Sequence, residues 1–190
     1  MAGLAELPPG LVTLEEWDAL ELDEARRWEL IEGGIVMTPR PRPLHQVVSR
    51  NLSQLIRKNL PASLVVLQEV EVTVEARFPP TVRDPDLVVV NRSVVDRNPV
   101  RVDPSDVVLV IEIVSPGSRR TDRVMKAYEY AKAGIEHYWI VDLDADLDER
   151  FLAHVLRAET YHRVEVLVGD RVRTAEPLVL HFALDELTQP

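Results

Sequence analysis

Apolar residues change their spacing several times along the chain, and the changes predict an alternation of helices and strands. Thr13 followed by Glu16 is a capping-box pattern, which predicts a short helix. Residues 44–60 carry apolar side chains at helical spacing and predict a long helix. Residues 119–133 predict another helix, and Gly134 is a natural residue for the position after its end.

Short apolar runs and period-two alternation predict strands in the first half of the chain. Residues 28–37, with Gly33-Gly34 in the middle, predict a hairpin whose two-residue turn needs glycine. In residues 64–74, valines alternate with polar residues, which predicts one half-solvated strand. Further strands are predicted at 85–90 and 107–114. The second of these is apolar at seven of eight positions, so both of its faces should be buried.

The second half of the chain continues this pattern. A strand is predicted at 137–141, and alternation resumes from Phe151, with Gly169-Asp170 as a hairpin turn. The order helix, three strands, helix, strand predicts a mixed α/β (α+β) fold, with a central sheet flanked by helices and extra β-hairpins at both ends. We expect a single domain over residues 1–190. Its parts are a core at about 44–142, an N-terminal helix and hairpin at 13–38, and a C-terminal β extension at 150–187.

The composition narrows the possible functions. The chain has 190 residues and no cysteine, which excludes disulfides, zinc–thiolate sites, iron–sulfur clusters and thiol nucleophiles. Acidic residues outnumber basic ones 32 to 22, and the net charge of -10 gives no overall basic footprint for nucleic acid. The N-terminal segment lacks a signal-peptide pattern, and no apolar run approaches the roughly 18–20 residues that span a bilayer. We therefore expect a cytoplasmic protein without membrane contact.

Two carboxylates stand where a buried charge needs a partner. Glu112 interrupts the apolar run 107–114, and a carboxylate buried there costs several kcal/mol unless a cation pairs with it. Asp86 opens the neighbouring strand. Two carboxylates that converge at one end of adjacent strands make an oxygen site suited to Mg²⁺ or Mn²⁺. The alternatives are a Glu112 paired with an arginine at an exposed strand end, and an Asp86 that serves only the turn before its strand.

Basic residues on the helix after Glu112 are candidates to serve that site. Three of the 22 basic residues are lysines, and Lys126 lies on this helix, at the edge of its expected packing stripe. The stripe consists of Val124, Ala127, Tyr130 and Ala131. From this edge the ammonium can reach the sheet and assist an attacking water, whereas the alternative is a solvated lysine. Three arginines also make the start of the helix basic, which fits a solvated face or contacts with a phosphate backbone. They are Arg119, Arg120 and Arg123.

These residues resemble a known nuclease motif. Pro85-Asp86, followed on the next strand by Glu112-Ile113-Val114, is similar to the bipartite motif of the PD-(D/E)xK superfamily, which has the restriction-endonuclease-like fold. Four segments in this order also resemble a large bacterial family of putative restriction endonucleases, formerly a domain of unknown function. They are WELIEG at 28–33, EIVSP at 112–116, the helix with Asp122, Lys126 and Tyr130, and GIEHYWIVD at 134–142.

The resemblance implies an endonuclease that uses Mg²⁺ or Mn²⁺ to hydrolyse phosphodiester bonds in DNA. Val114 stands where the superfamily motif has its lysine. In the family that the chain resembles, this lysine is taken to lie on the following helix, a position that corresponds to Lys126. The resemblance therefore implies that Lys126 assists the attacking water.

The same resemblance implies a set of residues around the ion. Asp86, Glu112 and the backbone carbonyl of Ile113 would hold it, and Glu29 would be an additional acidic residue at the site. For Glu29 the alternative is a salt bridge within its hairpin. His45 stands near a helix start, where similar proteins often carry a histidine, but we favour a capping or surface role for it.

A second function class fits the same fold. A protein of this fold with weak or lost catalysis can act by binding or assembly. The β extension from residue 150 could then form the interface of a homodimer or a higher homo-oligomer. The net charge of -10 favours this alternative, because it opposes association with DNA at long range. Metal binding and DNA cleavage distinguish the two functions.

Overall fold

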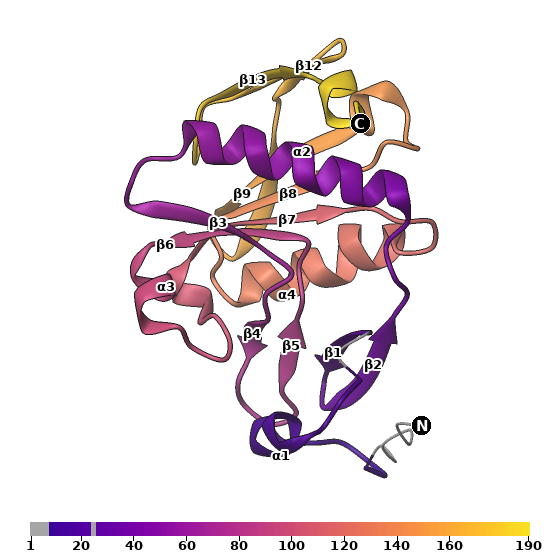
Figure 1. Ribbon diagram of the computed structural model, residues 1–190, viewed down its shortest axis with the longest axis vertical. Coiled ribbons are helices and arrows are strands. Elements are labelled where there is room, and N and C mark those ends of the chain that lie inside the picture. The colour runs from indigo at the N-terminus through magenta and orange to yellow at the C-terminus, as the bar shows by residue number, and fades with distance from the viewer. Residues whose placement is uncertain (1–7, 24–25) are drawn as a thin grey trace.

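The centre of the molecule is a six-stranded mixed sheet, seen in a computed structural model that describes residues 8–23 and 26–190 (Figure 1). The strand order is β10-β9-β8-β7-β6-β3, in which β7 and β8 are parallel and the other neighbours antiparallel. The strands are β3 (Leu64–Gln68), β6 (Leu87–Asn91), β7 (Val107–Ile113), β8 (His137–Val141), β9 (Phe151–Arg157) and β10 (Thr160–Val164). Residues 1–7 lie outside the described residues. They begin the N-terminal segment that lacks a signal-peptide pattern.

One helix covers each face of this sheet (Figure 1). α2 (Pro43–Asn59) packs its apolar stripe, which includes Leu52 and Ile56, against the face that carries Leu109. α4 (Ala127–Lys132) packs Tyr130 against the opposite face, which carries Val110. Successive strand residues therefore enter different cores, as expected for a strand buried on both sides. The predicted helix, three strands, helix, strand and the central sheet flanked by helices are confirmed.

A second sheet has four strands in the order β2-β1-β5-β4. Two of them, β1 and β2, come from the N-terminal part of the chain, and the other two come from the segment between β3 and β6. The strands of this sheet are β1 (Arg27–Ile31), β2 (Gly34–Thr38), β4 (Val72–Glu75) and β5 (Thr81–Arg83). α1 (Leu14–Ala19) packs on this sheet through Trp17, and its capping box between Thr13 and Glu16 is present as predicted. Strand β5 has no counterpart among the predicted elements, because three residues between prolines give no periodicity to detect.

Two sequence predictions in this region need correction. The expected single strand at 64–74 is two strands, β3 and β4, which lie in different sheets because Glu69 adopts a left-handed conformation with φ 51° and turns the chain. The hairpin turn consists of Glu32 and Gly33, both with positive φ, rather than of Gly33-Gly34. Positive φ at both turn residues matches the right-handed twist of the strands, so Gly34 is free to begin β2.

The predicted C-terminal β extension at 150–187 is divided between two sheets: β9 and β10 belong to the central sheet, and the strands after them form a third sheet beside α2 (Figure 1). The third sheet consists of β11 (Leu167–Val168), β12 (Arg171–Thr174) and β13 (Leu180–Ala183), and the predicted turn at Gly169-Asp170 joins the first two strands. The remaining short helices are α3 (Ser93–Arg97), η1 (Pro104–Asp106), η3 (Leu147–Glu149) and η4 (Leu184–Leu187). No helix in the described part of the chain combines the length and apolar character needed to cross a bilayer.

The helix predicted at 119–133 contains a wide turn. Residues Thr121–Lys126 form a π-helix, η2, which continues into α4. This wider turn changes which side chains face the sheet: Asp122 and Lys126 are buried, whereas Val124 is 60% exposed. The predicted packing stripe is therefore wrong at Val124 and correct at Tyr130 and Ala131, which are buried. Gly134 has φ 80°, as expected for the residue after the helix.

Candidate active site

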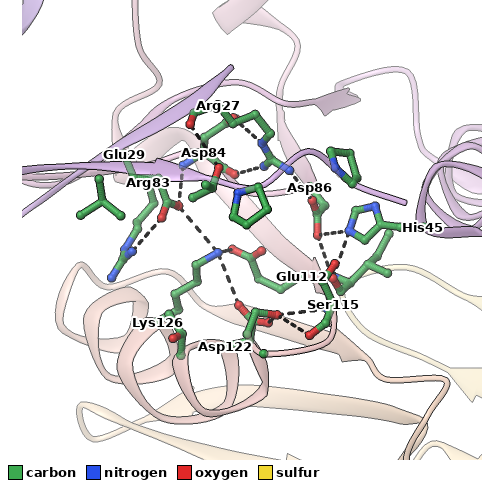
Figure 2. Close-up of a pocket in the computed structure, with 18 of the residues that line it drawn as sticks. Arg27, Glu29, His45, Arg83, Asp84, Asp86, Glu112, Ser115, Asp122 and Lys126 are labelled. Carbon is green, nitrogen blue, oxygen red and sulfur yellow. Dashed lines mark hydrogen bonds and ion pairs between the residues drawn. The ribbon is translucent and has the colours of Figure 1, made fainter. Parts of the chain in front are cut away.

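A pocket of about 540 Å³ lies where the four-stranded sheet approaches one end of the central sheet (Figure 2). Its walls come from β1, β2 and β5, the start of α2, the end of β7 and the π-helix η2. The residues predicted from sequence all line it. They are Glu29, Asp86, Glu112, Ile113 and Lys126.

Asp86 is held at the start of β6 by three donors. Ile113 donates its backbone N–H to Asp86 Oδ2 over 2.7 Å, and Arg27 Nη1 donates to Oδ1 over 2.9 Å. His45 Nε2 lies 3.2 Å from Oδ2 and 3.1 Å from the Ile113 carbonyl oxygen, so this nitrogen carries the proton. Burial alone would raise the pKa of Asp86, but His45, Arg27 and the Ile113 N–H outweigh it and lower the pKa to about 2. Asp86 is therefore a carboxylate at neutral pH.

Glu112 enters the pocket from β7 and is 3% exposed. Its Oε1 accepts a hydrogen bond from the Tyr130 hydroxyl at 2.7 Å and lies 2.9 Å from Lys126 Nζ. Burial raises the pKa of Glu112 above its ordinary value, assisted by the charges of Asp86 and Asp122, whereas the neighbouring Lys126 ammonium opposes this and favours the carboxylate form. The expectation of a buried carboxylate that needs a cation agrees with this environment, and the alternative of an exposed strand end does not.

Lys126 is buried in the pocket rather than solvated. Its Nζ lies 3.5 Å from Asp122 Oδ1 and 3.7 Å from Glu29 Oε1, in addition to the contact with Glu112. Burial alone would lower the pKa of Lys126, but the facing carboxylates of Glu112, Glu29 and Asp122 outweigh it and raise the pKa above its ordinary value. Asp122 and Lys126 both face inward from the π-helix η2, a kind of turn that is frequent at functional sites.

Glu29 reaches the same group from β1. Its Oε2 lies 2.9 Å from Nη1 of Arg83, which comes from β5, and its Oε1 accepts the Asp84 backbone N–H at 3.3 Å. Glu29 is 4% exposed. The alternative of a salt bridge confined to the β1–β2 hairpin is wrong, because the charged partners of Glu29, Arg83 and Lys126, lie outside that hairpin.

The pocket contains oxygen donors of the kind that divalent cations prefer. Mg²⁺ is usually bound by one or two carboxylates and keeps several waters, and Asp86, Glu112 and the Ile113 carbonyl supply hard oxygens of this kind. Buried Asp84 Oδ1 makes no hydrogen bond to any described residue. Within the described part of the chain, no three His, Asp or Glu side chains are already grouped as ligands. The carboxylates instead contact Arg27, His45 and Lys126, so an ion would have to replace some of these contacts.

A family model described as Uma2, putative restriction endonuclease, matches residues 14–186. The chain belongs to the Uma2 family. The resemblance predicted from four segments of the sequence is thereby confirmed. No curated protein matches the sequence.

A solved structure has a similar fold. The crystal structure of a putative nuclease from Anabaena variabilis is similar with a TM-score of 0.70 and 19% sequence identity, and the match covers 93% of this chain and 97% of that one. At this identity the likeness shows the fold alone, which is the restriction-endonuclease-like α+β arrangement expected from the sequence.

Several pocket residues of this Uma2 chain escaped the sequence analysis. His45 was expected at a cap or on the surface, but it lies against Asp86 in the pocket (Figure 2). Arg83, fully buried, donates two hydrogen bonds to Glu129 and one to Glu29. The signal in the sequence was the run Arg83-Asp84-Pro85-Asp86, which holds three charged residues and stands directly before four apolar ones. The prediction from sequence used only Asp86 from this run.

The basic start of the 119–133 helix serves the structure of this Uma2 chain. Arg119 forms two hydrogen bonds to Asp142, and Arg123 pairs with Glu149 at 2.5 Å and with Asp142 at 3.2 Å. The guanidiniums of Arg119 and Arg123 already have anionic partners, which disfavours phosphate-backbone contacts for these two residues, whereas Arg120 is exposed, as the alternative of a solvated face expects.

Proposed function

We propose that the chain is an endonuclease that hydrolyses phosphodiester bonds in DNA with the help of Mg²⁺ or Mn²⁺. The observation that carries the proposal is the meeting of Asp86, Glu112 and Lys126, from three different elements, in one pocket. Membership of a family of putative restriction endonucleases supports the reaction class.

Asp86, Glu112 and the Ile113 carbonyl would hold the cation. When bound, such an ion polarises a phosphate and lowers the pKa of an attacking water. Arg27, the Ile113 N–H and His45 fix the orientation of the Asp86 carboxylate, because each of them donates a hydrogen bond to it or lies within hydrogen-bond distance. Second partners of this kind commonly orient metal ligands.

Lys126 would act as a cation rather than as a base, because three carboxylates surround it and favour its protonated form. Its ammonium can donate a hydrogen bond to the attacking water or to the phosphate oxygens, where negative charge grows in the transition state. Glu29 and Asp122 hold the ammonium from the sides that Glu112 leaves open.

Metal titration followed by a cleavage assay tests the proposal. Isothermal titration calorimetry should detect Mn²⁺ binding to the wild-type protein that is lost in Asp86→Asn and in Glu112→Gln. Asp144→Asn, which removes an exposed carboxylate outside the pocket, should leave the binding intact. Cleavage of single- or double-stranded DNA should fall about 10²–10³-fold in Lys126→Met and stay unchanged in Lys58→Met, whose lysine is exposed.

The competing binding or assembly function has its own signature. It retains support from the net charge of -10 and from the contacts that already neutralise Glu112 and Asp86. A protein that binds no Mn²⁺, cuts no DNA and forms a stable oligomer by size-exclusion chromatography with light scattering would establish that function and exclude the nuclease.

A further inference from the structure

Two arginines of the pocket wall have no acidic partner. Arg40 and Arg42 line the pocket and are exposed, so they lie on its open side. Neither side chain forms an ion pair or a hydrogen bond with any residue that the structure describes. Arg27 and Arg83 line the same pocket, but Asp84, Asp86, Glu29 and Glu129 already neutralise them. Lys126 also lines the pocket, but Glu29, Glu112 and Asp122 surround its ammonium. Among the described residues of the pocket wall, Arg40 and Arg42 are therefore the arginines whose positive charge no acidic side chain offsets.

The segment that carries these arginines is stiff. Pro39, Pro41 and Pro43 alternate with them, and each proline fixes its own φ and keeps the preceding residue extended. Arg42 accordingly has φ -74° and ψ 160°. In a chain of this extended form two residues span about 6 Å, so the two guanidiniums start from fixed and separate positions. An anion that binds both meets little further loss of backbone entropy.

Charge changes sign from the inside of the pocket to its open side. Five acidic residues line the pocket, and they include the buried Asp86 and Glu112. Arg40 and Arg42 follow outside them, and α2 begins directly after Arg42 with no acidic residue in its first turn. Its N-terminus therefore adds positive potential on the same side. An acidic interior next to a basic rim suits a chain of phosphates, one of which meets a metal ion while its neighbours meet guanidiniums.

We propose that Arg40 and Arg42 are positioning residues that bind the phosphate backbone of the DNA strand next to the phosphate to be cleaved. The inference rests on the proposed nuclease function and adds to it the two residues that would hold the strand beside the phosphate to be cleaved. A polynucleotide presents one phosphate to the acidic interior and neighbouring phosphates to the arginines, whereas an isolated phosphate ester cannot reach both.

The salt dependence of DNA binding tests these phosphate contacts without requiring catalysis. Fluorescence anisotropy measures the affinity of a labelled single-stranded oligodeoxynucleotide over a range of NaCl concentrations, with Ca²⁺ as the only divalent ion. For the double variant Arg40→Ala/Arg42→Ala, the slope of log affinity against log salt should become shallower by about 1.4, because each lost phosphate contact with a single strand removes about 0.7. Arg40→Lys/Arg42→Lys keeps both charges and should keep most of the slope.

The matched control is Arg57→Ala/Lys58→Ala, which removes the same two charges from the exposed last turn of α2. Arg57 lies about 18 Å along the helix from His45, and the wild-type slope should persist in this control. Equal slopes in both double variants, or a wild-type protein that does not bind the strand at low salt, would overturn the inference. Binding with the expected slopes but without cleavage in Mg²⁺ would support the phosphate contacts of Arg40 and Arg42 and contradict the nuclease function. In an active enzyme, the arginine double variant should raise KM and leave kcat within about twofold.

Discussion

Buried charges in the pocket are held by opposite charges, and Arg83 is the most enclosed of them. Its side chain has no exposed surface, and its guanidinium lies 2.7 Å from Glu129 and 2.9 Å from Glu29. An ion pair removed from water contributes little beyond the cost of desolvation, but removal of one partner leaves a buried charge without compensation. Arg83 therefore links β5, β1 and α4 in a way that no apolar side chain can replace singly.

Replacement of Arg83 by methionine should lower the free energy of unfolding by about 3–5 kcal/mol, because Glu29 remains buried without its guanidinium. Urea denaturation monitored by circular dichroism measures this change. The matched substitution Arg77→Met removes an arginine that is 83% exposed in its ion pair with Glu75, and it should leave the stability nearly unchanged, because water and salt screen an exposed ion pair. Equal losses in the two variants would show that Arg83 is not a structural link.

The Tyr130 hydroxyl should tune the affinity of the proposed metal site. It donates a 2.7 Å hydrogen bond to Glu112 and is fully buried. Tyr130→Phe should weaken Mn²⁺ binding about 10–100-fold in calorimetry, as is typical when a partner of a metal ligand is removed. Tyr161→Phe loses a comparable 2.7 Å hydrogen bond, to the Ile135 carbonyl, and should bind Mn²⁺ as the wild type does. An unchanged affinity in Tyr130→Phe would separate Glu112 from the metal.

For single residues, the sequence predicted the acidic side chains of the pocket better than the residues that pair with them. Glu112 was recognisable because a carboxylate within an apolar run has few explanations. His45 and Arg83 were not, because a histidine near a helix start and an arginine next to an aspartate are common on protein surfaces. Their burial depends on where β1 and β5 lie relative to α2 and α4, and spacing along the chain carries no information about that arrangement.

Among the elements, the β1–β2 hairpin depends on Gly33. This residue has φ 75°, and a Cβ atom there would lie 2.9 Å from Leu11 Cβ and 3.3 Å from Pro79 Cβ. Gly33→Ala should destabilise the protein by more than the roughly 1–2 kcal/mol that the left-handed conformation alone costs, because side chains on both sides must move. Thermal denaturation measures the difference from wild type.

Gly169→Ala is the matched control for this hairpin. Gly169 also has positive φ, 61°, but no atom lies within 4 Å of the position where its Cβ would be. The substitution should cost only the backbone contribution. If both variants melt at the same temperature, the close approach of Leu11 and Pro79 has no energetic weight.

Predictions of elements from sequence were accurate where one periodicity applied throughout. The observed bounds of α2 differ from the predicted ones by only one residue at each end. The agreement is close because the apolar spacing of this helix is regular and prolines mark its two ends. The prediction at 64–74 was wrong because strand-forming residues continue on both sides of Glu69 with no Gly or Pro between them. The backbone nevertheless turns at Glu69, and the second half joins another sheet. The π-helix η2 was not predictable from an ideal helical wheel, which assumes a constant number of residues per turn.

For the whole molecule, bound metal should stabilise the folded chain. A ligand that binds only the native state at about 100 times its Kd adds about 2.7 kcal/mol, which corresponds to a rise in Tm of about 5–10 °C for a chain of this size. Differential scanning fluorimetry with MgCl₂ should detect this rise in wild type and in Asp144→Asn, but not in Asp86→Asn. A rise that is equal in all three would reflect general screening of the net charge of -10.

The pocket draws its groups from two sheets that share no hydrogen-bonded ladder, and this division has a consequence for folding. Glu29 and Arg83 belong to the four-stranded sheet. Among the described residues, its apolar cluster with α1 has four buried members, Val12, Trp17, Leu30 and Val82, and its other members are partly buried. A unit with so small a core opens at lower free energy than the central sheet. Amide hydrogens of β1 should exchange faster than those of β7, and activity should be lost on heating while the central sheet is still intact.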